Sequence, residues 1–216
     1  MSGTVHACLL VFGAGGHGRV VADAARATGD WQEIAFVDDR YPDLKQSGPW
    51  PVVGRFADAA ALLAHYPDAA LGVGNNGVRA AMYERLQGLG YALPPVVHPS
   101  AVVSPDTSIA AGAVVLARAI VNIGAEIGPA AIVNSAAVIE HDCKLGLASH
   151  VCPAAALAGD VEVGPLATIG IGTAVRQCMR IGAGATVGAG AAVVAHVAEG
   201  LTVAGVPARA MRPCAA

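Results

Sequence analysis

The residues best suited to chemistry in this sequence form the run Glu140-His141-Asp142-Cys143. Histidine is the side chain whose pKa suits proton removal near neutral pH, so His141 is the candidate general base. Its place in a turn, two residues after Ile139, predicts an imidazole that projects outward. A solvated turn histidine without a catalytic role is the alternative. The position of the Asp142 carboxylate does not follow from spacing alone.

A glycine-rich turn near the start of the chain is suited to binding a phosphate group. The turn follows an apolar run at residues 7–12. A second apolar run at residues 34–37 is followed directly by two acidic residues. Glycine N–H groups at a helix N-terminus bind a diphosphate, and an acid at the tip of the following strand accepts hydrogen bonds from a ribose or a base. The pattern also satisfies the G-x-G-x-x-G fingerprint of nicotinamide-dependent enzymes, and a tight turn without a ligand is a third interpretation. The candidate ligand-binding residues are Gly13, Gly15, Gly16, His17, Gly18, Asp38 and Asp39.

The elements around this turn predict a small Rossmann-like α/β unit. An amphipathic helix is expected at residues 20–28, and short strands at 7–12, 34–37 and 69–73. Three strands are about half of what a dinucleotide-binding domain contains, so we expect a ligand of mononucleotide size. The Pro94-Pro95 pair cannot continue a helix. We therefore predict a first domain over residues 1–95 and a second over 96–216.

The second domain repeats with a period of six residues. From Val97 to Val193, every sixth residue is Val, Ile or Leu, a small or apolar residue comes four positions later, and Gly often follows directly. This period matches neither a helix nor a simple strand. It suits a solenoid whose short strands and tight turns stack aliphatic side chains in ladders. A buried helical bundle is the alternative, but the glycine content and the β-branched residues oppose it.

Composition excludes several classes of protein. The formal charge of −3 over 216 residues, with 13% charged residues, offers no basic field for nucleic acid. Hydrophobic residues make up 55% of the chain, which rules out disorder, and the apolar stretches are too interrupted for a membrane span. The start lacks a basic leader, so we expect a cytoplasmic protein. Five cysteines without C-x-x-C spacing predict neither a disulfide framework nor a structural zinc site.

The repeat pattern [LIV]-G-x-x-[ASTV]-x resembles the hexapeptide acyltransferases. This resemblance implies a left-handed parallel β-helix with three hexapeptides in each coil, closed by the segment Gly205 to Arg212. The glycine turn and the Glu-His-Asp-Cys run extend the likeness to nearly the whole chain. Together they resemble the sialic-acid O-acetyltransferase-like family, which includes nucleotide-sugar N-acetyltransferases.

The resemblance implies acetyl transfer from acetyl-coenzyme A to the 4-amino group of a nucleotide-linked sugar. GDP-perosamine or a UDP-4-amino sugar is the expected substrate, and O-antigen or lipopolysaccharide assembly the expected setting. His141 is then the general base and Asp142 orients its imidazole. Gly159, one coil beyond His141, leaves a gap beside the ring and offers a backbone N–H to the thioester carbonyl. Neither a metal, a nucleic acid nor a membrane is implied as a partner.

His150 lies half a coil from His141, so the two histidines of one chain should point from different faces. The resemblance implies a homotrimer in which each active site lies between two subunits, and His150 then touches the thioester region of acetyl-coenzyme A. Asn134, expected near His141 in the same coil, is assigned to the sugar. The remaining coenzyme A contacts are expected at Gly170, Ile171, Gly188, Ala189 and Arg209.

Three other functions stay open at this point. A nicotinamide-dependent oxidoreductase would use the glycine turn, but no substrate domain other than the solenoid is available to it. A sialic-acid-type O-acetyltransferase would use the same histidine on a hydroxyl group. A non-catalytic trimeric solenoid would bind nucleotide sugars without turnover.

Overall fold

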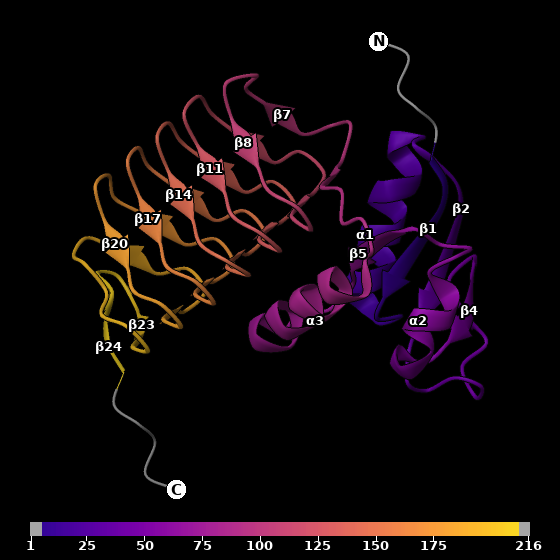
Figure 1. Ribbon diagram of the computed structural model, residues 1–216. Helices are drawn as coiled ribbons and strands as arrows, with labels where there is room; N and C mark the ends of the chain where they lie inside the picture. The colour runs from indigo at the N-terminus through magenta and orange to yellow at the C-terminus, as the bar shows by residue number, and fades with distance from the viewer. Residues whose placement is uncertain (1–5, 212–216) are drawn as a thin grey trace, which may run out of the picture. The chain divides into compact units, whose positions relative to one another are not determined.

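The computed structural model describes residues 6–211, and the chain divides into two compact units between Pro99 and Ser100 (Figure 1). Arg212, the last residue of the expected closing segment, and Cys214 lie outside the described residues. No helix in the described range combines the length and hydrophobicity needed to cross a membrane.

The first unit is built on a five-stranded sheet in the order β3-β4-β2-β1-β5. Strand β1 pairs in parallel with β2 and β5, and β2 with β4. The elements are β1 (His6–Phe12), α1 (Gly16–Thr28), β2 (Trp31–Val37), β3 (Gln46–Ser47), β4 (Trp50–Gly54), η1 (Phe56–Asp58), α2 (Ala59–Leu62), β5 (Asp68–Leu71), α3 (Asn76–Leu89) and β6 (Val96–Val97).

The predicted count of three strands was wrong. Strands β3 and β4 were missed because Gly48, Pro49 and Pro51 make this segment look like a loop. The structure also starts α1 at Gly16, earlier than the predicted residue 20. The strand count therefore gives no reason to prefer a mononucleotide over a dinucleotide.

The second unit is a left-handed parallel β-helix with three walls, and its coils run from β7 toward β24 in Figure 1. Strands pair across one full coil, as Ile120 with Val138, which are 18 residues apart. Wall 1 contains β7 (Val102–Val103), β10 (Ile120–Val121), β13 (Val138–Ile139), β16 (Ala156–Leu157), β19 (Ala174–Val175) and β22 (Ala192–Val193). Wall 2 contains β8 (Ser108–Ile109), β11 (Glu126–Ile127), β14 (Lys144–Leu145), β17 (Glu162–Val163) and β20 (Arg180–Ile181).

Wall 3 continues the chain from wall 2 and leads back to wall 1. It contains β9 (Val114–Val115), β12 (Ile132–Val133), β15 (His150–Val151), β18 (Thr168–Ile169), β21 (Thr186–Val187), β23 (Thr202–Ala204) and β24 (Arg209–Ala210). Strand β24 closes this wall by pairing antiparallel with β23. The expected closing segment thus contains the last strand of the solenoid, β24, as far as the structure describes it.

The interior of the β-helix consists of the predicted ladders. The second residue of each short strand points inward and is buried from Val115 to Val193. Small side chains such as Ala119, Ala137 and Ser149 fill the corners, also fully buried. The hexapeptide prediction is confirmed, because this alternation of a large and a small inward residue produces its period.

The turns share one backbone feature that sets their spacing. A residue with positive φ recurs every six positions through the coils, as at Asp142, Ala148 and Ala154. For a residue with a Cβ this left-handed conformation costs about 1–2 kcal/mol, and asparagine and aspartate accept it most readily. Hydrogen bonds from coil to coil hold each turn in place, as from the Asp142 N–H to the Ile123 carbonyl (3.1 Å).

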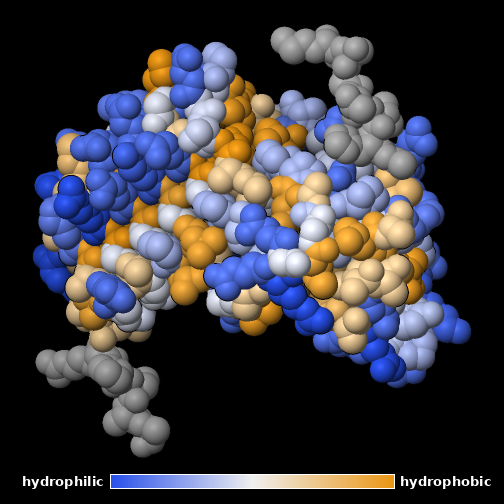
Figure 2. Space-filling view, viewed as in Figure 1, coloured by the Kyte–Doolittle hydropathy of each residue, from blue (hydrophilic) through white to orange (hydrophobic). Residues whose placement is uncertain are grey.

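The outward side chains differ sharply between two of the walls. On wall 1 they are all apolar and partly or fully exposed: Val102, Ile120, Val138, Ala156, Ala174 and Ala192. On wall 2 acidic and basic residues alternate, and ion pairs link Glu126 to Lys144 (3.2 Å) and Glu162 to Arg180 (3.6 Å). Figure 2 shows hydrophilic side chains over the face that carries β11, β14 and β17. The charged outward residues of wall 2 are typical of a solvent-exposed surface, whereas the apolar outward residues of wall 1 are typical of an interaction surface.

Strand β16 offers a matched test of the ladder. Leu157 is fully buried, whereas its neighbour Ala156 points outward. Leu157→Ala should lower the free energy of unfolding by about 2–5 kcal/mol, since it removes contacts and leaves a cavity. Ala156→Ser should change it by less than about 0.5 kcal/mol. Denaturant unfolding followed by circular dichroism measures both, and equal effects would contradict the inward and outward assignment.

Candidate active site

His141 lies in the turn between β13 and β14, at the corner where wall 1 meets wall 2. Its side chain is exposed, and its Nδ1 lies 2.8 Å from Oδ2 of Asp142. This hydrogen bond to a carboxylate is the main cause that raises the pKa of His141 above its usual value. With Nδ1–H donating to Asp142, Nε2 carries the lone pair that a general base needs. The predicted outward projection is confirmed.

Gly159 stacks one coil beyond His141. A Cβ atom at Gly159 would lie 2.3 Å from His141 Nε2, so no side chain fits there. The backbone N–H of Gly159 donates to no acceptor within the described chain, while its carbonyl accepts from the Cys178 N–H (3.0 Å). The expected gap beside the imidazole is confirmed. The role of this N–H toward a thioester stays a prediction.

Gly124 clears space for the carboxylate in the same way, and sequence reasoning missed it. It lies one coil before Asp142, and a Cβ atom there would lie 2.4 Å from Asp142 Oδ1. Its φ of 73° also favours glycine. The 18-residue spacing was the signal that would have found it. The histidine and the acid are thus each accommodated by a glycine in an adjacent coil.

Asn134 lies at another corner, where wall 3 meets wall 1. Its Nδ2 is 3.0 Å from Nε2 of His150, which starts β15 in wall 3. The expectation that Asn134 lies near His141 was wrong, because Asn134 turns the chain into β13 and His141 turns it out of the same strand. The spacing argument for His150 holds: it lies on wall 3, away from the His141 corner.

The turns predicted to follow the coenzyme A arm lie along the Asn134 corner. Gly170 and Gly188 come one coil and two coils beyond Cys152, the residue stacked on Asn134. A Cβ atom at Gly170 would lie 2.6 Å from backbone atoms of the next coil, so close stacking already requires glycine there. Ile171 and Ala189, which follow them, are exposed. Arg209 in β24 is also exposed and donates to the Ala208 carbonyl (2.9 Å).

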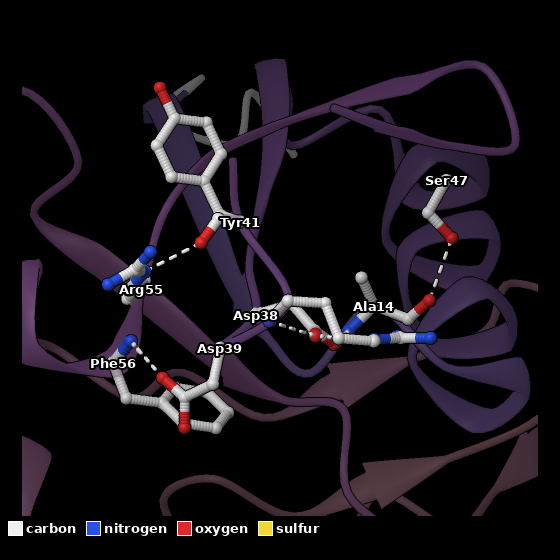
Figure 3. Close-up of polar contacts among 8 residues, drawn as sticks. Ala14, Asp38, Asp39, Tyr41, Ser47, Arg55 and Phe56 are labelled. Atoms are coloured by element: carbon white, nitrogen blue, oxygen red, sulfur yellow. Dashed lines mark hydrogen bonds and ion pairs between the residues drawn. The ribbon is translucent and has the colours of Figure 1, made fainter. Parts of the chain in front are cut away.

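In the first unit, the glycine turn between β1 and α1 is held from both sides (Figure 3). The Ala14 N–H donates to Oδ2 of Asp38 (2.9 Å), and the Ser47 hydroxyl donates to the Ala14 carbonyl (2.8 Å). Gly15 caps α1, and the space around it and Gly16 is open. The first N–H groups of a helix have no acceptor within the helix. This end of α1 can therefore bind an anionic group.

Asp38 and Asp39 both make contacts that sequence reasoning did not predict. Arg40 donates from Nε and Nη2 to the two carboxylate oxygens of Asp38 (2.7 and 2.9 Å), and these bonds are the main cause that lowers the pKa of Asp38 to about 2. Asp39 accepts from the Phe56 N–H (3.0 Å) and lines a cavity of about 340 Å³ beside Phe12. Asp38 thus positions the turn, while Asp39 borders this cavity.

Gly18 and His17 serve the packing of α1. A Cβ atom at Gly18 would lie 1.8 Å from the Gly13 carbonyl oxygen, so this glycine allows helix and turn to touch. Burial, aided by the charge of Arg79, lowers the pKa of His17 to about 4, so the ring is neutral. Arg79 is itself buried and donates to the carbonyls of Val73 (3.1 Å) and Gly74 (2.9 Å). It fixes the loop after β5, and sequence reasoning missed this role because no motif marks it.

Comparisons with known proteins agree with both units. The PglD N-terminal domain family matches residues 8–86. UDP-N-acetylbacillosamine N-acetyltransferase of Bacillus subtilis (strain 168) is 38% identical over 112 residues, which are 50% of this chain and 51% of that relative. The match therefore spans about half the length of this curated relative.

Two solved structures match over nearly the full chain. The acetyltransferase domain of PglB from Neisseria gonorrhoeae, in complex with acetyl coenzyme A, is 41% identical with a TM-score of 0.89, covering 94% of this chain and 98% of that one. PerB from Caulobacter crescentus, in complex with CoA and GDP-perosamine, is 36% identical with a TM-score of 0.90, covering 94% and 97%.

The fold and the corner histidine define a hexapeptide-repeat acyltransferase. At this level of identity and coverage, the chain belongs to the family of nucleotide-sugar N-acetyltransferases that carry a PglD-type N-terminal domain. Membership in this family is the reason to reject the nicotinamide-dependent oxidoreductase as the function. The number of strands in the first unit does not exclude it.

The hydrogen bond between His141 and Asp142 predicts a measurable titration. Asp142→Asn removes the negative charge that favours the imidazolium form, so the pKa of His141 should fall. Glu126→Gln, which removes an acid from wall 2, should leave it unchanged. The imidazole resonances of His141, followed by NMR against pH, measure the shift. A pKa of His141 that is unchanged in Asp142→Asn would contradict the assigned contact.

Proposed function

We propose that this protein transfers the acetyl group of acetyl-coenzyme A to the 4-amino group of a nucleotide-linked sugar. The observation that carries the proposal is the His141 corner, with an imidazole paired to Asp142, a glycine that leaves room for Nε2, and a backbone N–H without an acceptor in the described chain beside it. The relatives support it, because PglB and PerB were solved with acetyl coenzyme A, or with CoA and GDP-perosamine. GDP-perosamine is the preferred substrate, in cytoplasmic assembly of O-antigen glycans.

In the proposed reaction His141 Nε2 accepts a proton from the amine nitrogen as that nitrogen attacks the thioester carbonyl carbon. The Gly159 N–H donates to the carbonyl oxygen as negative charge develops. Collapse of the adduct forms the amide bond and breaks the C–S bond, and the thiolate takes up the proton held by His141. Asp142 keeps the imidazole in the required tautomer throughout. No covalent enzyme intermediate is needed.

We propose that three chains pack through wall 1. This wall exposes only apolar outward residues, and its two edges are the His141 corner and the Asn134 corner. Packing of wall 1 around a three-fold axis brings the His141 corner of one chain beside the Asn134 corner of the next. Asn134 and His150 of one subunit then face His141 of another, across the acetyl group. In this arrangement the two histidines contribute to one site although they lie on different faces of a single chain, because each site combines residues of two chains.

The first unit supplies affinity for the nucleotide in this proposal. The open N-terminus of α1 at Gly15 and Gly16 accepts the diphosphate, and the cavity lined by Asp39 accepts the base. Gly13, Gly18 and Asp38 hold the turn in shape. The loops after β1 and β5 follow the carboxyl ends of two neighbouring parallel strands, which is where open α/β sheets bind ligands.

A substrate panel tests the proposal. Purified protein is incubated with acetyl-coenzyme A and with GDP-, UDP- or dTDP-linked 4-amino sugars, and thiol release is followed. The product should gain one acetyl group in mass and resist mild alkali, because an amide survives where an ester is cleaved. An alkali-labile product would assign the protein to the O-acetylating enzymes, and no turnover would support the trimeric binding solenoid.

Two substitutions at the His141 corner should remove turnover without unfolding the protein. His141→Asn removes the base, which is typically worth about 100- to 10,000-fold in rate. Gly159→Ala places a methyl group 2.3 Å from the present position of His141 Nε2, so the ring must move, and the substitution should cost a comparable factor. Gly88→Ala, whose methyl enters open space on α3, is the control with unchanged kcat. Either corner variant with more than half of the normal kcat would remove that residue from the mechanism.

Arginine substitutions on two walls test the trimer. Ala174→Arg places a charge on the exposed apolar wall 1 and should lower the mass seen by light scattering to that of a monomer, with loss of turnover. Ser108→Arg adds the same side chain to wall 2 and should leave both unchanged. A trimer that persists in Ala174→Arg but dissociates in Ser108→Arg would move the interface to wall 2.

A further inference from the structure

Three side chains with metal-binding atoms meet in the first unit, away from every residue used above. Cys8 on β1 and Glu33 on β2 are register partners, and His65 lies in the turn between α2 and β5. Cys8 Sγ is 3.7 Å from Glu33 Oε2 and 4.0 Å from His65 Nε2. His65 Nε2 is 3.4 Å from the same carboxylate oxygen. These atoms form a compact triangle of sulfur, nitrogen and oxygen.

The triangle has the size of one face of a tetrahedral zinc site. Zinc bonds of about 2.3 Å to sulfur and about 2.0–2.2 Å to nitrogen and oxygen place tetrahedral ligand atoms about 3.4–3.6 Å apart. The three observed separations agree with this to within a few tenths of an ångström. We propose that Cys8, Glu33 and His65 bind one Zn²⁺ ion, with water in the fourth position.

Neighbouring groups already orient two of the ligands. The Tyr66 hydroxyl donates to Oε1 of Glu33 (2.6 Å), which leaves Oε2 directed at the cysteine and the histidine. The His65 ring packs edge-on against Tyr66, with ring centroids 4.5 Å apart. Partners of this kind fix the ligands of natural metal sites. Tyr66 is buried, so it is a rigid support for both.

The charges of the ligands suit a divalent ion. Zinc binding displaces the proton of the Cys8 thiol, and one thiolate with one carboxylate then balances the charge of the ion. Cys8 is buried while Glu33 and His65 are exposed, so the ion has a path from solvent.

The site lies toward the amino-terminal end of the parallel strands, whereas the glycine turn follows their carboxyl-terminal end. A bound ion would tie β1 and β2 to the segment before β5. Its expected effect is on the stability of the first unit and not on acetyl transfer. The proposal is thus independent of the proposed reaction.

Metal titration of the untagged, metal-free protein tests the site. Isothermal calorimetry with Zn²⁺ should show one ion bound per chain, with affinity reduced at least about tenfold in Cys8→Ser, Glu33→Gln and His65→Asn. Substitution by Co²⁺ should give a sulfur-to-metal charge-transfer band that is lost in Cys8→Ser. Cys152→Ser, which removes a half-buried cysteine of the β-helix, and His141→Asn are the controls, and both should keep the affinity and the band.

Absence of binding by the normal protein, or equal affinity in the Glu33→Gln and His65→Asn variants, would overturn the proposal. These two residues are exposed, so their substitution is compatible with folding, which circular dichroism checks. Loss of the cobalt band in Cys152→Ser instead of Cys8→Ser would place the metal elsewhere.

Discussion

The stacking of each residue on the one 18 positions away is the constraint on which the second unit depends. It lines up the buried aliphatic ladders, pairs the charges of wall 2, and repeats a left-handed turn residue at each corner from Gly112 to Gly190. The same stacking builds the His141 corner. Gly159 makes room for the imidazole of His141 from the following coil, and Gly124 makes room for the carboxylate of Asp142 from the preceding one.

This constraint explains why the β-helix was predictable from sequence. A period of six with inward Val, Ile or Leu defines the coil, and counting 18 residues from His141 finds Gly159 without a structure. The same arithmetic would have found Gly124. Sequence reasoning misplaced Asn134 because it relied on the short distance along the chain to His141, although a strand separates the two corners. The contact between Asn134 and His150 joins two adjacent coils. It depends on the direction and length of the two side chains, which the residue spacing does not predict.

The first unit was less predictable because its contacts have no period. Strands β3 and β4 are short and interrupted by proline and glycine, so they resemble a loop. Asp38 matches the position of a ribose-binding acid, yet its oxygens hold Arg40 and the glycine turn. The meeting of Cys8, Glu33 and His65 joins three distant segments, and no spacing motif for metal binding reveals it. In this unit tertiary packing, and not local pattern, decides what each polar residue does.

The proposed packing through the apolar wall 1, which has the His141 corner at one edge and the Asn134 corner at the other, makes one active site depend on two chains. Mixing two inactive variants tests this most directly. His141→Asn and His150→Ala should each lose turnover alone, whereas trimers reassembled from an equal mixture should recover about one quarter of the normal rate, because that fraction of interfaces joins an intact His141 to an intact His150. No recovery at any mixing ratio, with mixed trimers shown to form, would contradict a site shared between subunits.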